Sequence, residues 1–107
     1  MSAALDEIAA ERERQIAVEG WTPEHDDQHA RGEMAAAASC YAANACLAAC
    51  SPETAFKPGD IPPAAWMWGA GWWKPKGARR DLVRAAALIV AEIERLDRLS
   101  SPENEET

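Results

Sequence analysis

Large apolar side chains are scarce in this sequence of 107 residues. It contains one Phe and one Tyr, and alanine supplies much of its hydrophobic fraction of 48%. Strands are enriched in β-branched and aromatic residues, whereas Ala, Leu, Glu and Arg favour helices. The composition therefore argues against a β-sheet protein and predicts an all-α fold. The length allows one domain and excludes a second.

Segments that direct a chain into or across a membrane are also missing. No run of 18 apolar residues occurs, and the N-terminal residues lack a basic segment followed by an apolar one. Neither a membrane span nor a signal peptide is expected, which indicates a cytoplasmic protein. The three cysteines, Cys40, Cys46 and Cys50, form no CxxC pair, and an odd number argues against a disulfide framework. We expect them to be small buried side chains.

Positive charge is in short supply, with 11 basic against 18 acidic residues and a formal net charge of -7. Phosphate backbones are bound by clustered Lys and Arg, so general binding of nucleic acids or anionic membranes is not expected. The charge is uneven, however, because the first 33 residues and the tail 103–106 are acidic. Five basic residues gather within a short stretch: Lys74, Lys76, Arg79, Arg80 and Arg84.

Three main helices are predicted. The first covers about 3–19, where an apolar stripe is expected at Leu5, Ile8 and Ile16, with Arg12 among them. The second covers about 23–49, with Thr22 as its N-cap and Pro23 at its first position. Its interior is nearly all Ala and Cys, which favours burial on more than one side.

The third helix, over about 78–99, has the clearest pattern. A single amphipathic stripe is formed by its apolar residues: Leu82, Ala86, Ile89, Ile93 and Leu96. Residues 51–77 contain five prolines and four glycines, which forbid a long helix and predict an irregular loop. Residues 1–99 would form one helical domain, followed by a polar acidic tail over 100–107.

Tryptophan is the residue in excess. Four of the five tryptophans, Trp66, Trp68, Trp72 and Trp73, fall within eight positions of the loop. Indole faces stack on bases, and nearby Lys or Arg binds phosphate. Lys74, Lys76, Arg79 and Arg80 follow directly, so the segment 66–80 suits a nucleotide-like ligand. The structural alternative is that each Trp caps an alanine-rich core that lacks large side chains.

A second cluster consists of His25, Asp26, His29 and Glu33. On one helix, the spacing of four would align both histidines with Glu33 along a stripe. Such a stripe could hold a metal ion, perform acid and base chemistry, hydrogen-bond a ligand, or have no special role. We assign His25, Asp26 and His29 to ligand binding and predict neither a metal site nor a cofactor.

Several blocks of the chain resemble a family of small accessory proteins of tailed phages and prophages. They are ERERQ at 11–15, EGWTPEHDD at 19–27, WKP at 73–75, RDLV at 80–83 and AEIERLDR at 91–98. The resemblance implies action in the host bacterial cytosol, either in taking over the host or in countering its defences, rather than a virion or replication role.

A shorter stretch is similar to the ryanodine-receptor repeat, a small helical module. The similarity rests on Gly20-Trp21-Thr22, on Asp26-Asp27 and on His29, which is followed by Ala30 where that repeat usually has Pro. The resemblance implies that this block forms part of a pocket for a nucleotide-derived signal. Trp21 would stack on the ligand, and the acids or His29 would contact a ribose or a base edge.

The sequence therefore predicts a phage counter-defence protein that sequesters a small anionic nucleotide, such as a cyclic immune signal, without turnover. A homo-oligomer is expected, because alanine-lined surfaces gain burial by self-association. One alternative is an acidic inhibitor that binds a host defence complex. The other is a magnesium-dependent all-α nucleoside triphosphate pyrophosphohydrolase. The resemblance to such enzymes rests on Glu33, Glu92 and the ExxD spacing of Glu94 and Asp97, whose carboxylates would hold the magnesium.

Overall fold

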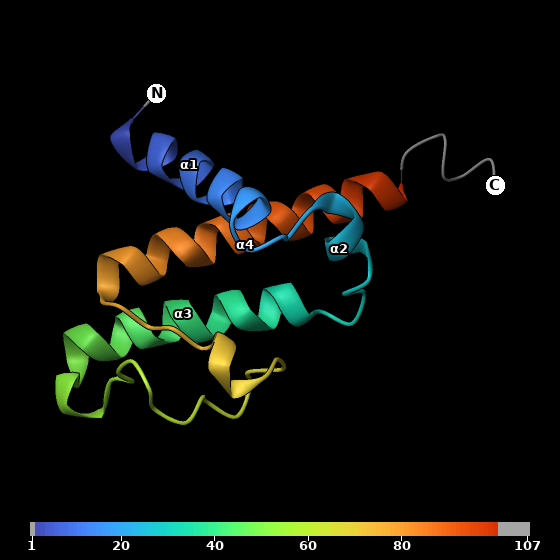
Figure 1. The fold of residues 1–107 in the computed structure, drawn as a ribbon. Coiled ribbons are helices and arrows are strands. Elements are labelled where there is room, and N and C mark those ends of the chain that lie inside the picture. Colours follow the sequence, from blue (N-terminus) through green and yellow to red (C-terminus); the bar gives the residue numbers. More distant parts are fainter. Residues whose placement is uncertain (1, 101–107) are drawn as a thin grey trace.

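A computed structural model describes residues 2–100 of the chain and confirms an all-α fold (Figure 1). The helices are α1 (Ala3–Ala17), α2 (Pro23–Asp27), α3 (Glu33–Cys50) and α4 (Ala78–Leu99). Two 3₁₀ turns, Pro52–Thr54 and Ala70–Trp72, lie in the long loop. The predicted tail over 100–107 lies outside the described residues apart from Ser100. None of the helices within residues 2–100 is both long enough and apolar enough to cross a membrane.

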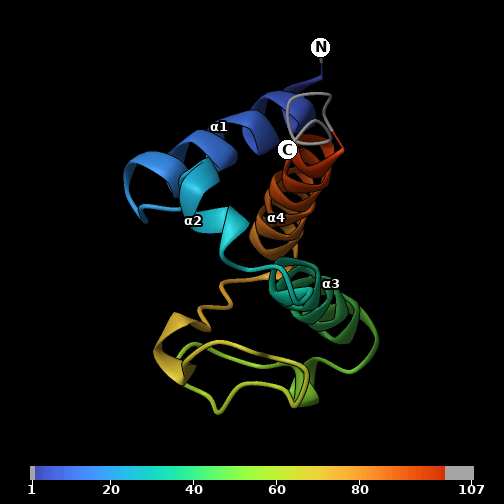
Figure 2. The same cartoon turned by 90° about the vertical axis from the view of Figure 1, so that its right-hand side faces the viewer.

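The helices and the loop are stacked in layers. α3 and α4 lie side by side and run in opposite directions, and α1 crosses α4 on the side away from α3 (Figures 1 and 2). The loop 51–77 runs along α3 on its other side (Figure 2). α4 coincides with the predicted range 78–99, whereas α1 ends at Ala17, two residues before the predicted boundary.

The single helix predicted over 23–49 is wrong, because the chain leaves the helical path between α2 and α3. Gly32 precedes α3 with φ +84°, a left-handed conformation that glycine adopts without steric cost. The α2 start agrees with the prediction, since Thr22 Oγ1 accepts a hydrogen bond from the His25 N–H at 3.2 Å. The break lets α2 pack against α4 while α3 takes a separate direction.

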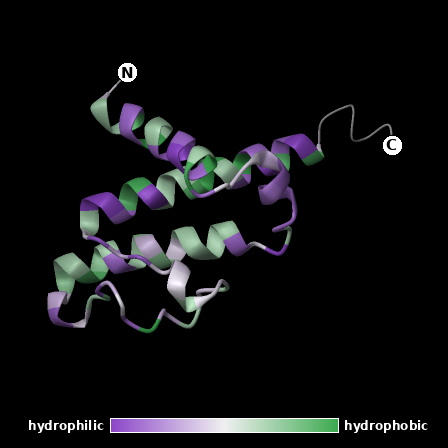
Figure 3. Ribbon diagram, viewed as in Figure 1, coloured by the Kyte–Doolittle hydropathy of each residue, from purple (hydrophilic) through white to green (hydrophobic). Residues whose placement is uncertain are grey.

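Small side chains line the core between α3 and α4. Its buried apolar residues are Met34, Ala37, Ala38, Cys40, Tyr41, Trp73, Ala85, Leu88 and Ala91. Figure 3 shows α3 mostly in hydrophobic colours, while α1 and α4 alternate between polar and apolar. Cys40 is buried as expected, but the prediction is wrong for Cys46 and Cys50, which are exposed on the outer side of α3.

Both ends of the long loop are anchored by buried polar side chains. Asn44 of α3 accepts from the Phe56 N–H at 2.7 Å and donates to the Phe56 carbonyl at 3.1 Å. Asp81 of α4, which is fully buried, accepts from the Lys76 N–H at 2.9 Å and from Asn44 at 3.4 Å. The loop is therefore fixed to the helices rather than free, and its tryptophans have defined positions.

The apolar stripes of α1 and α4 are not the faces that the chain buries. On α4, Leu82 and Ile93 are 51% and 52% exposed, whereas Arg84 and Arg95 are buried. On α1, Leu5 is exposed, and the buried residues are Glu11, Arg12 and Gln15. These polar side chains can be buried because each has a hydrogen-bond partner. Arg12 and Glu11 pair with other helices, Arg95 and Gln15 pair within their own helices, and Arg84 donates to a loop carbonyl.

Candidate ligand-binding cleft

The turn between α1 and α2 places Trp21 beside the loop. Gly20 has φ +76°, and the turn is closed by a hydrogen bond of 2.9 Å from the Trp21 N–H to the Gln15 carbonyl. Arg12 also donates to the Trp21 carbonyl at 3.1 Å. The Trp21 indole is thereby held against Trp68 and Trp72 of the loop, with ring centroids 5.6 and 6.2 Å away.

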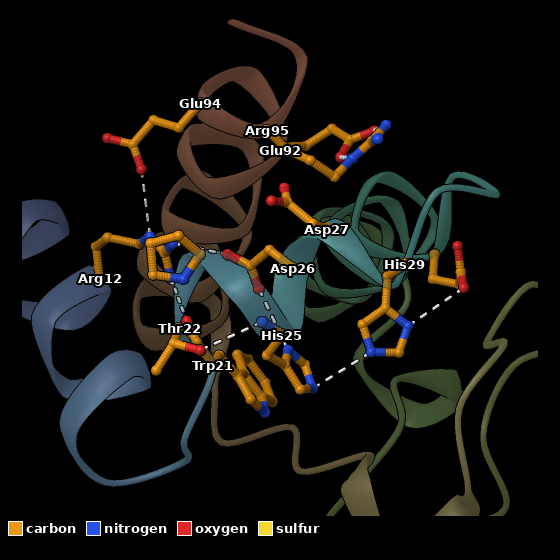
Figure 4. A network of polar contacts seen from close by, with 12 residues as sticks. Arg12, Trp21, Thr22, His25, Asp26, Asp27, His29, Glu92, Glu94 and Arg95 are labelled. Atoms are coloured by element: carbon orange, nitrogen blue, oxygen red, sulfur yellow. Dashed lines mark hydrogen bonds and ion pairs between the residues drawn. The ribbon is translucent and has the colours of Figure 1, made fainter. Parts of the chain in front are cut away.

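A buried ion pair fixes α2 against α1. Arg12 Nη2 lies 2.7 Å from Asp26 Oδ2, and the side chains are 8% and 1% exposed. Glu94 of α4 adds a longer ionic contact of 3.5 Å to Arg12 Nε (Figure 4). The Asp26 carboxylate was predicted to contact a ligand, but it is directed at Arg12 and positions α2 instead.

His25 and His29 form a chain of polar contacts between two acids (Figure 4). Their Nε2 atoms are 3.3 Å apart, His25 Nδ1 lies 3.4 Å from Asp26 Oδ1, and His29 Nδ1 lies 3.2 Å from Glu33 Oε2. A hydrogen bond between the rings requires one Nε2 to carry hydrogen and the other to accept it. His25, His29 and Glu33 therefore meet although they do not share one helix.

That arrangement does not converge on a point where a metal ion could sit. His29 stands between His25 and Glu33 and uses both ring nitrogens for them. Across residues 2–100, no group of three or more His, Cys, Asp and Glu side chains is placed to hold a metal ion. The acids of the pyrophosphohydrolase alternative are dispersed: Glu92 pairs with Arg95, and Glu94 contacts Arg12.

An aromatic cleft of about 370 Å³ opens between α2 and the loop. Its lining residues are Glu19, Trp21, His25, His29, Trp68, Gly69 and Trp72. The His25 ring is stacked on Trp21 with an interplanar angle of 10°, and His29 meets Trp68 edge on. Trp72 is 46% exposed, so a large aromatic face remains open to a planar ligand.

A smaller hollow of about 160 Å³ adjoins the aromatic cleft, since Glu19, Trp21 and Trp72 line both. Its other lining residues are Glu11, Arg14, Gln15, Tyr41, Lys74, Lys76, Arg84 and Leu88. Lys74 Nζ lies 5.6 Å from the Trp72 ring centroid, a cation–π distance. Four basic side chains against two carboxylates make this hollow suitable for an anionic group.

Two buried polar atoms in this hollow have no hydrogen-bond partner. Gln15 Oε1 accepts nothing, although its Nε2 donates to Glu11 at 3.2 Å, and Arg84 Nε donates to nothing, although Nη1 donates to the Lys74 carbonyl. Gln15 is 1% exposed and Arg84 8%. Gln15 and Arg84 therefore each keep one acceptor or donor that bonds to no protein group within residues 2–100.

The carboxylate of Glu11 keeps the basic groups of α1 and α4 in place. It accepts from Arg14 Nε and Nη2 at 2.8 and 2.9 Å, and Arg80 also donates to it. Burial raises the pKa of Glu11, but hydrogen bonds and charge from Arg14 and Arg80 outweigh burial, so the pKa lies below its ordinary value. Glu11 is therefore ionised in the folded protein at neutral pH.

Apart from Asp26, the predicted site residues divide into four groups. Trp21, His25, His29, Trp68 and Trp72 line the aromatic cleft, and Lys74 and Lys76 line the basic hollow. Trp66 and Trp73 instead pack around Tyr41, with centroid distances of 5.7 and 4.8 Å. Arg79 and Arg80 pair with Glu7 and Glu11 of α1. The loop thus combines tryptophans that line the cleft with tryptophans that pack around Tyr41.

Sequence reasoning missed Arg14, Gln15 and Arg84 as lining residues. Gln15 follows Glu11 by four positions and Arg12 by three, so the three share one face of α1 beside Ile8. Three polar side chains grouped beside the weak apolar stripe are the signal that could have identified this face. Tyr41, at the centre of the alanine-rich segment, carries no comparable signal.

A larger hollow, of about 540 Å³, lies within the loop itself, between Pro58–Ile61 and 70–76. Half of its lining residues are Pro, Gly or Ala, and the others include Trp73, Lys74 and Lys76, so the two lysines border this hollow as well as the smaller basic one. Comparison of the chain with family models, curated proteins and solved structures found no match. The resemblance to phage proteins and to the ryanodine-receptor repeat stays a prediction.

Proposed function

We propose that this protein binds and sequesters a small anionic, nucleotide-like ligand without converting it. The observation that carries the proposal is the junction of the two hollows: Trp21 and Trp72 line both, and the smaller hollow is also lined by Lys74, Lys76 and Arg84. A purine or pyrimidine fits aromatic walls, and its phosphate fits the basic residues beyond them. Sequestration needs binding alone.

The two polar atoms without a hydrogen-bond partner, Gln15 Oε1 and Arg84 Nε, favour particular groups on the ligand. Gln15 Oε1 accepts hydrogen bonds, so it suits a base amino group or a ribose hydroxyl. Arg84 Nε donates, and with Lys74 and Lys76 nearby it suits a phosphate oxygen. A phage accessory role, in which the withheld ligand is a cyclic nucleotide immune signal of the bacterial host, extends this proposal on the strength of the sequence resemblance.

Nucleotide binding can be measured by calorimetry and by Trp fluorescence, with mono-, di- and cyclic nucleotides and without added metal. Trp72→Ala is the informative variant, because the side chain is half exposed and supports no core packing. Loss of one stacking contact costs about 1–3 kcal/mol, so the dissociation constant should rise roughly 5- to 150-fold.

Met67→Ala is the matched control, since Met67 is a similarly exposed apolar residue of the same loop outside both hollows. Its affinity should equal that of the wild type. A flat response of the wild-type protein across the whole nucleotide panel would overturn the proposal, as would equal binding by Trp72→Ala.

A further inference from the structure

An apolar surface that the helices leave open follows α4. Leu82, Ile89, Ile93 and Leu96 are each about half exposed, between 48% and 52%. Together with Ala86 they repeat at intervals of 4, 3, 4 and 3 residues, the spacing of a seam between two packed helices. Within residues 2–100, no other element covers this seam.

We propose that a second copy of this chain covers the seam, with its α4 antiparallel to the first. The opposite face of α4 is already occupied, because α1 and α3 pack there. One seam on each copy makes the contact self-complementary, as a two-fold dimer requires. In this arrangement Leu82 of one copy lies opposite Ile93 of the other, and the small Ala86 lies opposite the larger Ile89.

Charge sets the direction of the second helix. Arg79 near the N-terminal end of α4 and Asp97 near its C-terminal end lie on the same flank of the seam and carry opposite charges. Both are exposed, and Arg79 also pairs with Glu7 of its own chain. An antiparallel pair brings Arg79 of each copy beside Asp97 of the other. A parallel pair would set equal charges against each other at both ends, which is unfavourable.

The proposed interface leaves the ligand cleft open. Arg84 and Leu88 line the basic hollow, and at about 100° per residue they lie roughly 200° and 240° around α4 from Leu82. The seam and the cleft are therefore on different sides of the same helix. Each copy in the dimer keeps its own complete cleft, so the dimer does not depend on the proposed function.

Sedimentation of the full chain over a range of concentrations tests the seam. The wild-type protein should sediment at twice its chain mass of 11.6 kDa, and Ile93→Glu should sediment as a monomer. Ile61→Glu is the matched control, because Ile61 is 86% exposed in the loop, and this variant should stay dimeric. Circular dichroism of each variant verifies the helical fold.

A wild-type monomer at every concentration would overturn the proposal, and so would an assembly that persists in Ile93→Glu. A charge exchange tests the direction. Arg79→Asp and Asp97→Arg should each weaken the dimer about fivefold at low salt, and the double variant should recover it. Failure of the double variant to recover would overturn the antiparallel arrangement.

Discussion

At the scale of single residues, the main feature of this protein is that charged side chains are buried against partners of opposite charge. Arg12 and Asp26 are both buried, and buried Glu11 pairs with the partly exposed Arg14 and Arg80. Such pairs give modest net stability, but removal of one partner leaves an uncompensated charge. Neighbouring acids in one helix can therefore differ greatly in their effect on folding.

Asp26 and Asp27 provide that comparison in α2. Asp26→Asn should lower the free energy of unfolding by about 3 kcal/mol, because Arg12 remains buried without its counter-ion. Asp27→Asn should cost less than about 1 kcal/mol, since Asp27 is half exposed and its contact with Arg98 lies at the surface. Urea denaturation at pH 7 measures both, and equal costs would show that the Arg12 pair does not anchor α2.

The lowered pKa of Glu11 predicts that the free energy of unfolding depends on pH. Its folded pKa is depressed, so the unfolded chain binds more protons as pH falls through the acidic range. The contribution of Glu11 to the free energy of unfolding is complete above the ordinary carboxyl pKa. It is lost as the pH falls through the lower pKa that Glu11 has in the folded protein. Glu11→Gln should cost about 2 kcal/mol at pH 7 and flatten the slope of stability against pH below about pH 5.

Glu7→Gln is the control for that experiment. Glu7 lies one turn earlier in α1, and its hydrogen bond with Arg79 lowers its pKa too, but both side chains are largely exposed. Solvent screens that pair, so the variant should retain almost the whole acidic slope of the wild type. Identical slopes for Glu11→Gln and the wild type would contradict the role given to Glu11.

At the scale of elements, local sequence signals were sufficient wherever a boundary depends on a few neighbouring residues. The start of α2 follows from Thr22 and Pro23, and the loop follows from its prolines and glycines. The break before α3 also has a local cause, Gly32 with its left-handed φ, but an isolated glycine is tolerated inside many helices and does not by itself predict a break.

The buried faces of α1 and α4 could not be predicted from periodicity. The apolar stripes suggested core faces, yet Ile8 and Ile16 on α1 are only partly buried and Leu82, Ile89 and Ile93 on α4 are about half exposed. The charged residues Glu11 and Arg84 are buried more deeply than any of them. Burial of a charge depends on its partner, and Glu11 meets Arg80 across 69 residues. Such pairs become visible only when the fold is known.

The candidate cleft could likewise be predicted from the sequence only in part. The aromatic and basic residues of the cleft belong to blocks that the sequence singles out, and Trp21, Trp72 and Lys74 do come together. Which of the five tryptophans face a ligand depends on how the loop is anchored. Trp73 fills the gap that alanines leave beside Tyr41, so it is structural although it adjoins Trp72 in sequence.

At the scale of the whole molecule, α4 separates the two proposed surfaces, with the ligand cleft on one side and the dimer seam on another. Ligand binding should raise the free energy of unfolding by about 2.7 kcal/mol at a free ligand concentration 100 times the dissociation constant. The nucleotide identified by calorimetry should therefore raise the melting temperature of both wild type and Ile93→Glu at equal chain concentration.

The ligand should raise the melting temperature of the wild type and of Ile93→Glu by the same amount, because Ile93 lines neither the aromatic cleft nor the basic hollow. Trp72→Ala should reduce the shift in either background while leaving the sedimentation of the wild-type dimer unchanged. If Ile93→Glu lost the shift together with the dimer, the cleft would require the second copy to be complete. The two surfaces would then form one site, which the positions of Arg84 and Leu82 around α4 argue against.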